Sequence, residues 1–225
     1  MGEANPSAMK TVSESLFEKF CDRNSIRWEK IPTANKRTAD YTIFPTGIKV
    51  VAEVKQIDRN KEDEKAEQKL NRGELVESSY DRGKRVGAKI RDANPKLAPH
   101  SKTGVPTILV LYGNVRPHLY TDAYDVRAAM YGVEQHFFVV SKDPSIPPFF
   151  GGKKLGPNQG MTRQHNTSIS ALAVMSGPLE IPELVIYHNV HARVSLPPEY
   201  FRPYTLNQFS LAEAVPGKYQ EWGRA

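Results

Sequence analysis

The chain of 225 residues has 39% hydrophobic residues, one cysteine, and 31 Lys and Arg against 25 Asp and Glu, a net charge of +6. The lone Cys21 excludes an intramolecular disulfide framework and a thiolate zinc cluster, and the lack of an apolar run of about 18 residues excludes a transmembrane helix. Because the start, MGEANPSAMK, does not resemble a secretory signal, we expect a cytoplasmic protein, and the basic excess favours a polyanionic partner over a membrane.

The pattern of apolar residues predicts one α/β domain over 11–196, preceded by a flexible arm over 1–10 and followed by a proline-punctuated C-terminal extension over 197–225. Helices are predicted where apolar residues recur at three and four positions, at 11–24, 74–94 and 122–131. Strands are predicted where apolar residues alternate or form short continuous runs, at 26–31, 41–44, 48–54, 106–112, 137–140, 169–175 and 184–190.

Two segments are expected to be loops. Residues 58–74 contain eleven charged side chains and a single larger aliphatic, Leu70, which is too little apolar surface to fold alone. Residues 145–166 are rich in Pro and Gly and show no periodicity. The helix over 74–94 is expected to end at Pro95, because proline disfavours helical geometry in the residue before it.

The two strands over 41–44 and 48–54 predict a hairpin whose turn centres on Thr46 and Gly47. That register pairs Tyr41 with Ala52, Thr42 with Val51, Ile43 with Val50 and Asp40 with Glu53. Cross-strand partners have Cβ atoms roughly 5 Å apart, so two carboxylates are expected to face each other. Lys55, two residues beyond Glu53, points to the same face.

Like charges placed opposite each other destabilise a hairpin unless a cation lies between them. Mg²⁺ prefers oxygen ligands and retains several waters, so Asp40, Glu53 and the carbonyl of Val54 would leave room for a phosphate and a water nucleophile. The ammonium of Lys55 would then stabilise the attacking water or the phosphoryl oxygens.

The pattern of Asp40 followed by Glu53-Val54-Lys55 resembles the PD-(D/E)XK nuclease superfamily. The resemblance implies a restriction-endonuclease-like fold, with a central mixed β-sheet flanked by helices, and a Mg²⁺- or Mn²⁺-dependent nuclease that hydrolyses phosphodiester bonds, in DNA rather than RNA. Ala39 stands where the family usually has Pro. The resemblance further implies that Glu14 on the first helix completes the metal site, with Glu18 as the rival, and that Gln56 belongs to the catalytic motif.

Several basic and aromatic side chains are candidates for contacts with nucleic acid. On the helix over 74–94 and in the loop over 145–166 these are Tyr80, Arg82, Arg85, Lys89, Lys153, Lys154 and Arg163. Two alternatives stay open, a non-catalytic nucleic-acid-binding module on the same fold and a structural or interaction protein. A second copy of the motif, Glu67-Gln68-Lys69, lies in the charged segment without a predicted strand. A homodimer would be the simplest way to cut both strands of a duplex.

Overall fold

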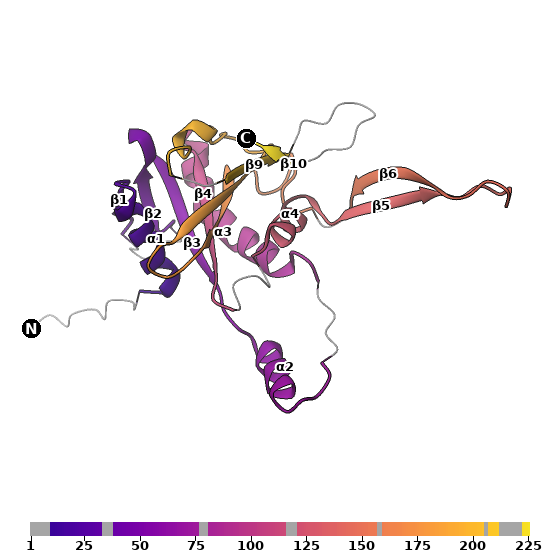
Figure 1. Ribbon diagram of the computed structural model, residues 1–225. Helices are drawn as coiled ribbons and strands as arrows, with labels where there is room; N and C mark the ends of the chain where they lie inside the picture. Colours follow the sequence, from indigo (N-terminus) through magenta and orange to yellow (C-terminus); the bar gives the residue numbers. More distant parts are fainter. Residues whose placement is uncertain are drawn as a thin grey trace, which may run out of the picture.

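The structure, a computed structural model, describes residues 10–32, 38–76, 81–115, 121–156, 159–204, 207–211 and 222–225. This part of the chain is a mixed α/β fold with an eight-stranded mixed sheet flanked by helices (Figure 1). The strand order is β1-β2-β3-β4-β7-β8-β9-β10, and β5 and β6 pair with each other in a separate two-stranded sheet. The mixed α/β architecture predicted from the sequence is therefore confirmed.

The elements have the following bounds. The helices are α1 (Val12–Arg23), α2 (Lys61–Asn71), α3 (Lys84–Lys102) and α4 (Ala123–Tyr131). The strands of the large sheet are β1 (Arg27–Lys30), β2 (Tyr41–Phe44), β3 (Val50–Ile57), β4 (Thr107–Gly113), β7 (Ala171–Ser176), β8 (Glu183–His188), β9 (Asn207–Leu211) and β10 (Trp222–Arg224). The smaller sheet consists of β5 (Glu134–Val139) and β6 (Phe149–Leu155).

The centre of the large sheet is parallel, because β4 pairs in parallel with β3 on one side and with β7 on the other. Helices cover both faces of the sheet at this point. Side chains on both faces of β4 are therefore buried, which explains why its sequence is almost continuously apolar. Its fully buried residues are Thr107, Ile108, Leu109, Val110 and Leu111. The strand predicted over 106–112 is thus confirmed, including its burial on both faces.

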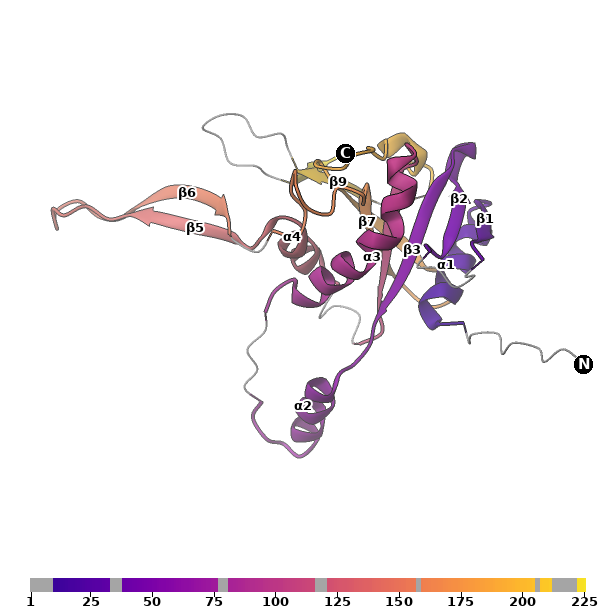
Figure 2. The ribbon, with the colours of Figure 1, turned by 180° about the vertical axis from the view of Figure 1, so that it is seen from behind.

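Each face of the sheet has its own hydrophobic core. On one face, α1 packs Leu16, Phe17 and Phe20 against the inward side chains of β2, β3, β4 and β7. On the other face, α3 and α4 contribute Val86, Ile90, Leu97 and Met130 among others. Figure 2 shows α3 lying across the front of the sheet when the molecule is seen from behind. The strand β3 is therefore held between α1 and α3.

The helix predicted over 74–94 differs from the structure at both ends. The helix α3 begins at Lys84 and continues to Lys102, with Pro95 and Pro99 inside it. An internal proline loses a hydrogen bond and strains the helix, but here the turns beyond Pro95 bury Leu97 completely in the second core. Tertiary burial outweighs the local preference of proline. At the start, Gly83 is required because a Cβ there would lie 2.5 Å from the backbone nitrogen of Ala129 on α4.

The charged segment 58–74, expected to be a loop, contains the helix α2. Asn60 caps it by accepting from the amides of Glu62 and Asp63, and the Asp63 side chain accepts from the Asn60 amide in return. The helix α2, which lies wholly within the described range 38–76, has no buried residue. Capping and charge pairs, rather than an apolar face, therefore define this helix.

The C-terminal half departs from expectation in two places. Residues 145–166 are not only a loop, because β6 lies within them and pairs with β5 to form a hairpin that projects from the body of the protein (Figure 1). Residues 197–225 are more than an extension, because β9 and β10 complete the edge of the large sheet and Phe201 and Leu211 are buried in its cores. Among the described residues, no helix has the length and apolarity needed to cross a bilayer.

Replacing Leu97 tests the continuation of α3 beyond Pro95. We expect Leu97→Ala to lower the free energy of unfolding by about 2–5 kcal/mol, because a fully buried side chain is lost from the core. The matched control is Leu70→Ala on α2, where the leucine is 51% exposed and the expected change is within about 0.5 kcal/mol. Urea unfolding followed by circular dichroism measures both, and equal effects would contradict the packing of α3.

Candidate functional site

The hairpin formed by β2 and β3 has the register that the sequence predicts. Tyr41 pairs with Ala52, Thr42 with Val51 and Ile43 with Val50. The turn is a single 3-10 turn over Pro45–Gly47, in which Thr46 and Gly47 have positive φ angles of 48° and 83°. The side chains of β3 alternate as expected, with Val50, Ala52 and Val54 in the core beside α1.

Asp40 lies at the entrance to β2, directly beside β3. Its amide donates to the carbonyl oxygen of Ala52 over 3.2 Å, and its carboxylate atom Oδ2 accepts from the amide of Val54 over 2.8 Å. The second of these contacts fixes the Asp40 carboxylate next to the residue that follows Glu53. The charge of Asp40 is close enough to raise the pKa of Glu53.

Glu53 is the most unusual side chain of the site because it is a carboxylate with 0% exposure. Its atom Oε1 accepts from Lys96 Nζ at 2.6 Å and lies 3.0 Å from Lys55 Nζ. Its other atom, Oε2, is buried and has no hydrogen-bond partner among the described residues. Burial raises the pKa of Glu53, as does the Asp40 charge, and the two lysines act in the opposite direction.

Lys55 is held between two carboxylates. Its ammonium lies 3.0 Å from Glu53 and 2.8 Å from Asp92, which is on α3. Burial lowers the pKa of Lys55, but the hydrogen bonds to Asp92 and Glu53 outweigh this effect and leave the pKa above its ordinary value. The side chain as a whole is 19% exposed, so Lys55 is mostly buried between these two carboxylates.

Glu14 and Glu18 lie on α1, on the opposite side of β2 and β3 from α3. The carboxylate of Glu14 accepts from the Thr11 amide and from Lys30 Nζ, so it caps its own helix and pairs with β1. Burial raises the pKa of Glu14, but these hydrogen bonds outweigh it and lower the pKa. Glu18 accepts from the hydroxyl of Tyr41 over 2.7 Å.

Tyr41, the residue after Asp40, lies within reach of the charges of Glu14, Glu18 and Asp40. Burial is the largest cause of its raised pKa, followed by the hydrogen bond to Glu18. The charges of Glu14 and Asp40 also raise the pKa of Tyr41, which means that both act on its hydroxyl. Glu14 and Glu18 thus lie on the α1 side of the sheet, paired with Lys30 and Tyr41, whereas Glu53 faces Lys96 of α3. The structure does not decide between them as a further ligand.

Gln56 joins β3 to the start of α1. Its side-chain oxygen accepts from the amide of Ser13 over 3.0 Å, and its side-chain nitrogen donates to Asp58. The Ser13 amide is one of the free amides at the N-terminus of a helix, so Gln56 satisfies it. This contact fixes the position of α1 relative to the strand that carries Glu53 and Lys55.

Sequence reasoning missed Asp92 and Lys96, which both contact the predicted motif. They lie four positions apart in the sequence and are therefore on one face of α3. The spacing was available in the sequence, but Lys96 lies beyond Pro95, where the predicted helix ended. The contacts arise because α3 continues past that proline and packs its length against β3.

The candidate nucleic-acid contacts are dispersed. Arg82 lies in the turn before α3, 3.5 Å from Asp122, and Arg85 on α3 lies 2.8 Å from Asp63 of α2. Lys153 on β6 lies 3.4 Å from Glu134 of β5. Lys89, Lys154 and Arg163 are at least partly exposed, on α3, on β6 and after β6 respectively. Tyr80 lies outside the described residues.

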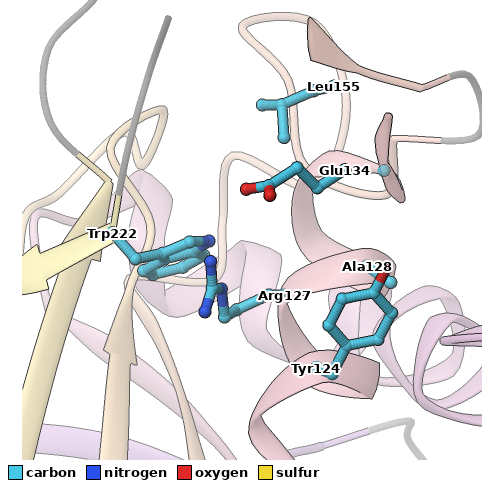
Figure 3. A pocket seen from close by; sticks show the side chains of 7 residues that line it. Tyr124, Arg127, Ala128, Glu134, Leu155 and Trp222 are labelled. Atoms are coloured by element: carbon cyan, nitrogen blue, oxygen red, sulfur yellow. The ribbon is translucent and has the colours of Figure 1, made fainter. Parts of the chain in front are cut away.

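A separate pocket lies between α4, the β5–β6 hairpin and β10 (Figure 3). Arg127 lies over the ring of Trp222, 5.6 Å from its centroid, and Glu134 lines the same space. The room for a water-sized molecule is about 10 Å³, which is close to a single water. This pocket shares no residue with the cluster around Glu53 and is too small for an organic ligand.

Asp40, Glu53, Lys55, Asp92 and Lys96 form the cluster that we call the carboxylate–lysine site. Within the part of the chain that the structure describes, no group of three or more His, Cys, Asp and Glu side chains is arranged to hold a metal ion. Comparisons of the chain with protein-family models, with curated proteins and with solved structures each found no match. The geometry of the carboxylate–lysine site is therefore the main indication of function.

A double-mutant cycle tests the contact between Lys96 and Glu53. We expect Lys96→Met to lower the free energy of unfolding by about 1–3 kcal/mol, because a buried carboxylate loses a charged partner. In a Glu53→Gln background the same change is expected to cost less than about 0.5 kcal/mol. Arg91→Met, an exposed position on the same helix, is the control. Equal effects of Lys96→Met in both backgrounds, measured by urea unfolding, would show that the two side chains do not interact.

Proposed function

We propose that the protein is a divalent-metal-dependent nuclease with a restriction-endonuclease-like fold, which hydrolyses phosphodiester bonds and acts on DNA rather than RNA. The observation that supports this proposal most strongly is the fully buried Glu53 carboxylate, whose Oε2 has no hydrogen-bond partner among the described residues. Burying a carboxylate is costly unless it is paired or binds a cation. Its neighbours Asp40 and Lys55 supply a second carboxylate and an ammonium group, which can serve as a metal ligand and as a cation beside the phosphate in metal-dependent phosphodiester hydrolysis.

The donor set suits a hard divalent cation. Glu53 has the free oxygen Oε2, and Asp40 uses only Oδ2 in hydrogen bonding among the described residues. With the carbonyl of Val54, these two carboxylates supply oxygen ligands, which Mg²⁺ and Mn²⁺ prefer, and water or substrate would complete the shell. When bound, the ion would acidify a water molecule and offset negative charge on the phosphate.

Lys55 is the proposed catalytic cation. Its ammonium would donate a hydrogen bond to the attacking water or to a phosphoryl oxygen as negative charge grows there. Asp92 would act as a positioning residue, because its carboxylate holds Lys55 Nζ at 2.8 Å. Gln56 would keep α1, and with it Glu14, at a fixed distance from β3.

Lys96 would balance charge at the same carboxylate. Its Nζ lies 2.6 Å from Glu53 Oε1, the same oxygen that Lys55 approaches, so Oε2 is left for a cation. The two ammonium groups also reduce the repulsion between the carboxylates of Glu53 and Asp40. They would thereby stabilise the folded state before any ion binds. The net charge of +6 would attract the polyanionic substrate to the protein.

A second candidate is a module that binds nucleic acid without cleaving it. The observation in its favour is that Lys55 and Lys96 both contact Glu53 and already neutralise its charge. Such a module would bind DNA with an affinity that falls steeply between low and moderate salt, because basic side chains release counterions from the phosphates. It would show no cleavage with any divalent cation.

The two copies of the Glu-x-Lys motif provide a matched test of catalysis. We expect Glu53→Gln and Lys55→Met each to reduce DNA cleavage in Mg²⁺ or Mn²⁺ by at least about 100-fold, because each removes a group that acts on the transition state. Glu67→Gln and Lys69→Met, the equivalent changes on α2, should cleave like the parent protein. Linear, circular and single-stranded DNA and RNA are the substrates, with chelator as the metal-free control.

The outcome separates the two candidates. Cleavage that disappears with chelator and with either change at Glu53 or Lys55 supports the nuclease. Equal cleavage by the parent and by Lys55→Met would show that the assigned residue is wrong. Salt-sensitive binding without cleavage of any substrate would identify the binding module instead.

A further inference from the structure

The strands β1 and β2 form an edge of the large sheet that only one of the two hydrophobic cores uses. On the α1 face, β2 contributes the buried side chains of Tyr41 and Ile43. Among the described residues, the core on the α3 face contains none from β1 or β2. Figure 2 shows these two strands at the edge of the sheet, beyond α3. The cores therefore do not account for the side chains that β1 and β2 present on the α3 face.

The strand register shows that this face also carries the carboxylate–lysine site. Thr42 of β2 lies opposite Val51 of β3, which is buried in the core beside α3. Two residues further along β2, Phe44 lies opposite Arg27 of β1. Directly opposed residues share a face, and every second residue of a strand returns to it. Arg27 and Phe44 are therefore on the same face as Glu53.

Arg27 and Phe44 together form a flat, positively charged surface that we call the stacking platform. The guanidinium carbon of Arg27 lies 3.7 Å from the centroid of the Phe44 ring, and the Arg27 side chain is 67% exposed. Its Nε lies 4.0 Å from Glu29, and within the described part of the chain it has no other charged partner. The contact with Phe44 thus holds a planar cation with five N–H donors at the surface.

Lys49 adds a second cation near the stacking platform. It follows the turn that Phe44 precedes, and it is exposed. Burial lowers the pKa of His100 on α3, and the charge of Lys49 lowers this pKa further, so the Lys49 ammonium lies near His100. His100 comes one helical turn after Lys96, which contacts Glu53. Lys49 is therefore close both to the stacking platform and to the helix that borders the carboxylate–lysine site.

The length of β2 sets the distance between the stacking platform and the carboxylate–lysine site. Phe44 follows Asp40 by four residues, which span about 13 Å at about 3.3 Å per residue. Successive nucleotides of a stacked strand rise by about 3.4 Å, so about four nucleotides fit this distance. Guanidinium planes and aromatic rings stack on unpaired bases, and ammonium groups pair with phosphates. Inside a duplex, neighbouring bases already cover both faces of each base, so the platform suits an unpaired one.

We propose that Arg27, Phe44 and Lys49 form a subsite that stacks an unpaired nucleobase of the substrate strand, about four nucleotides from the phosphate at the carboxylate–lysine site. The inference rests on the proposed function and narrows its substrate to single-stranded DNA or to a duplex with a single-stranded end. Arg27 would stack on the base, Phe44 would hold the guanidinium in place, and Lys49 would pair with a phosphate.

Binding of DNA in the presence of chelator tests the subsite without cleavage. Fluorescence anisotropy at fixed salt compares a short single strand with a blunt duplex of the same length, and the parent protein should bind the single strand at least about tenfold more tightly. Arg27→Lys keeps the charge but loses the planar group, and should weaken binding of the single strand about tenfold without changing that of the duplex. The matched control is Arg224→Lys, an exposed arginine on β10 at the opposite edge of the sheet, which should bind like the parent.

Photocrosslinking gives a second readout that needs no variant. A single strand that carries 5-iodouracil, placed at each position in turn, should crosslink to a peptide that contains Phe44. Crosslinks that map only to peptides without Arg27, Phe44 and Lys49 would overturn the subsite.

The outcomes separate the subsite from the nuclease. Equal binding of the single strand by the parent and by Arg27→Lys, or an equal loss in Arg224→Lys, would overturn the subsite even if cleavage depends on Glu53 and Lys55. Weaker binding by Arg27→Lys, in a protein that cleaves nothing in Mg²⁺ or Mn²⁺, would support the subsite and contradict the nuclease. A parent protein that binds no nucleic acid would overturn both.

Discussion

The arrangement of the site depends on one buried carboxylate. Glu53 has no solvent exposure, and it is tolerated there because Lys96 and Lys55 both contact Oε1. The contact with Lys96 requires α3 to lie against β3. The remaining oxygen, Oε2, has no hydrogen-bond partner among the described residues. It is therefore the atom of Glu53 that would bind a cation.

Local patterns were sufficient to predict the hairpin that carries the motif. The alternation of apolar residues in β3 and the turn at Thr46 and Gly47 fix the register, since a shift by one residue would move Val50 and Ala52 out of the core. The continuous apolar run of β4 likewise predicts a strand covered on both faces. These local patterns alone predict that Asp40 and Glu53 lie close together.

The remaining parts of the site depend on tertiary contacts that no local pattern contains. Pro95 favours the end of a helix, yet α3 continues because Leu97 is buried in the core, and this continuation brings Lys96 to Glu53. The charged segment 58–74 has no apolar face, so only the capping by Asn60 indicates α2. The strands β9 and β10 are short, and their pairing with the edge of the sheet depends on residues far away in the sequence.

The proposed activity requires that Asp40 and Glu53 bind one divalent cation between them. The most direct measurement is anomalous X-ray scattering from a crystal of the protein soaked in Mn²⁺. We expect a single strong peak within coordination distance of Asp40 and of Glu53 Oε2, and no such peak in a crystal of Glu53→Gln treated in the same way. Clear density for both carboxylates with no manganese peak between them would contradict the proposed cation site.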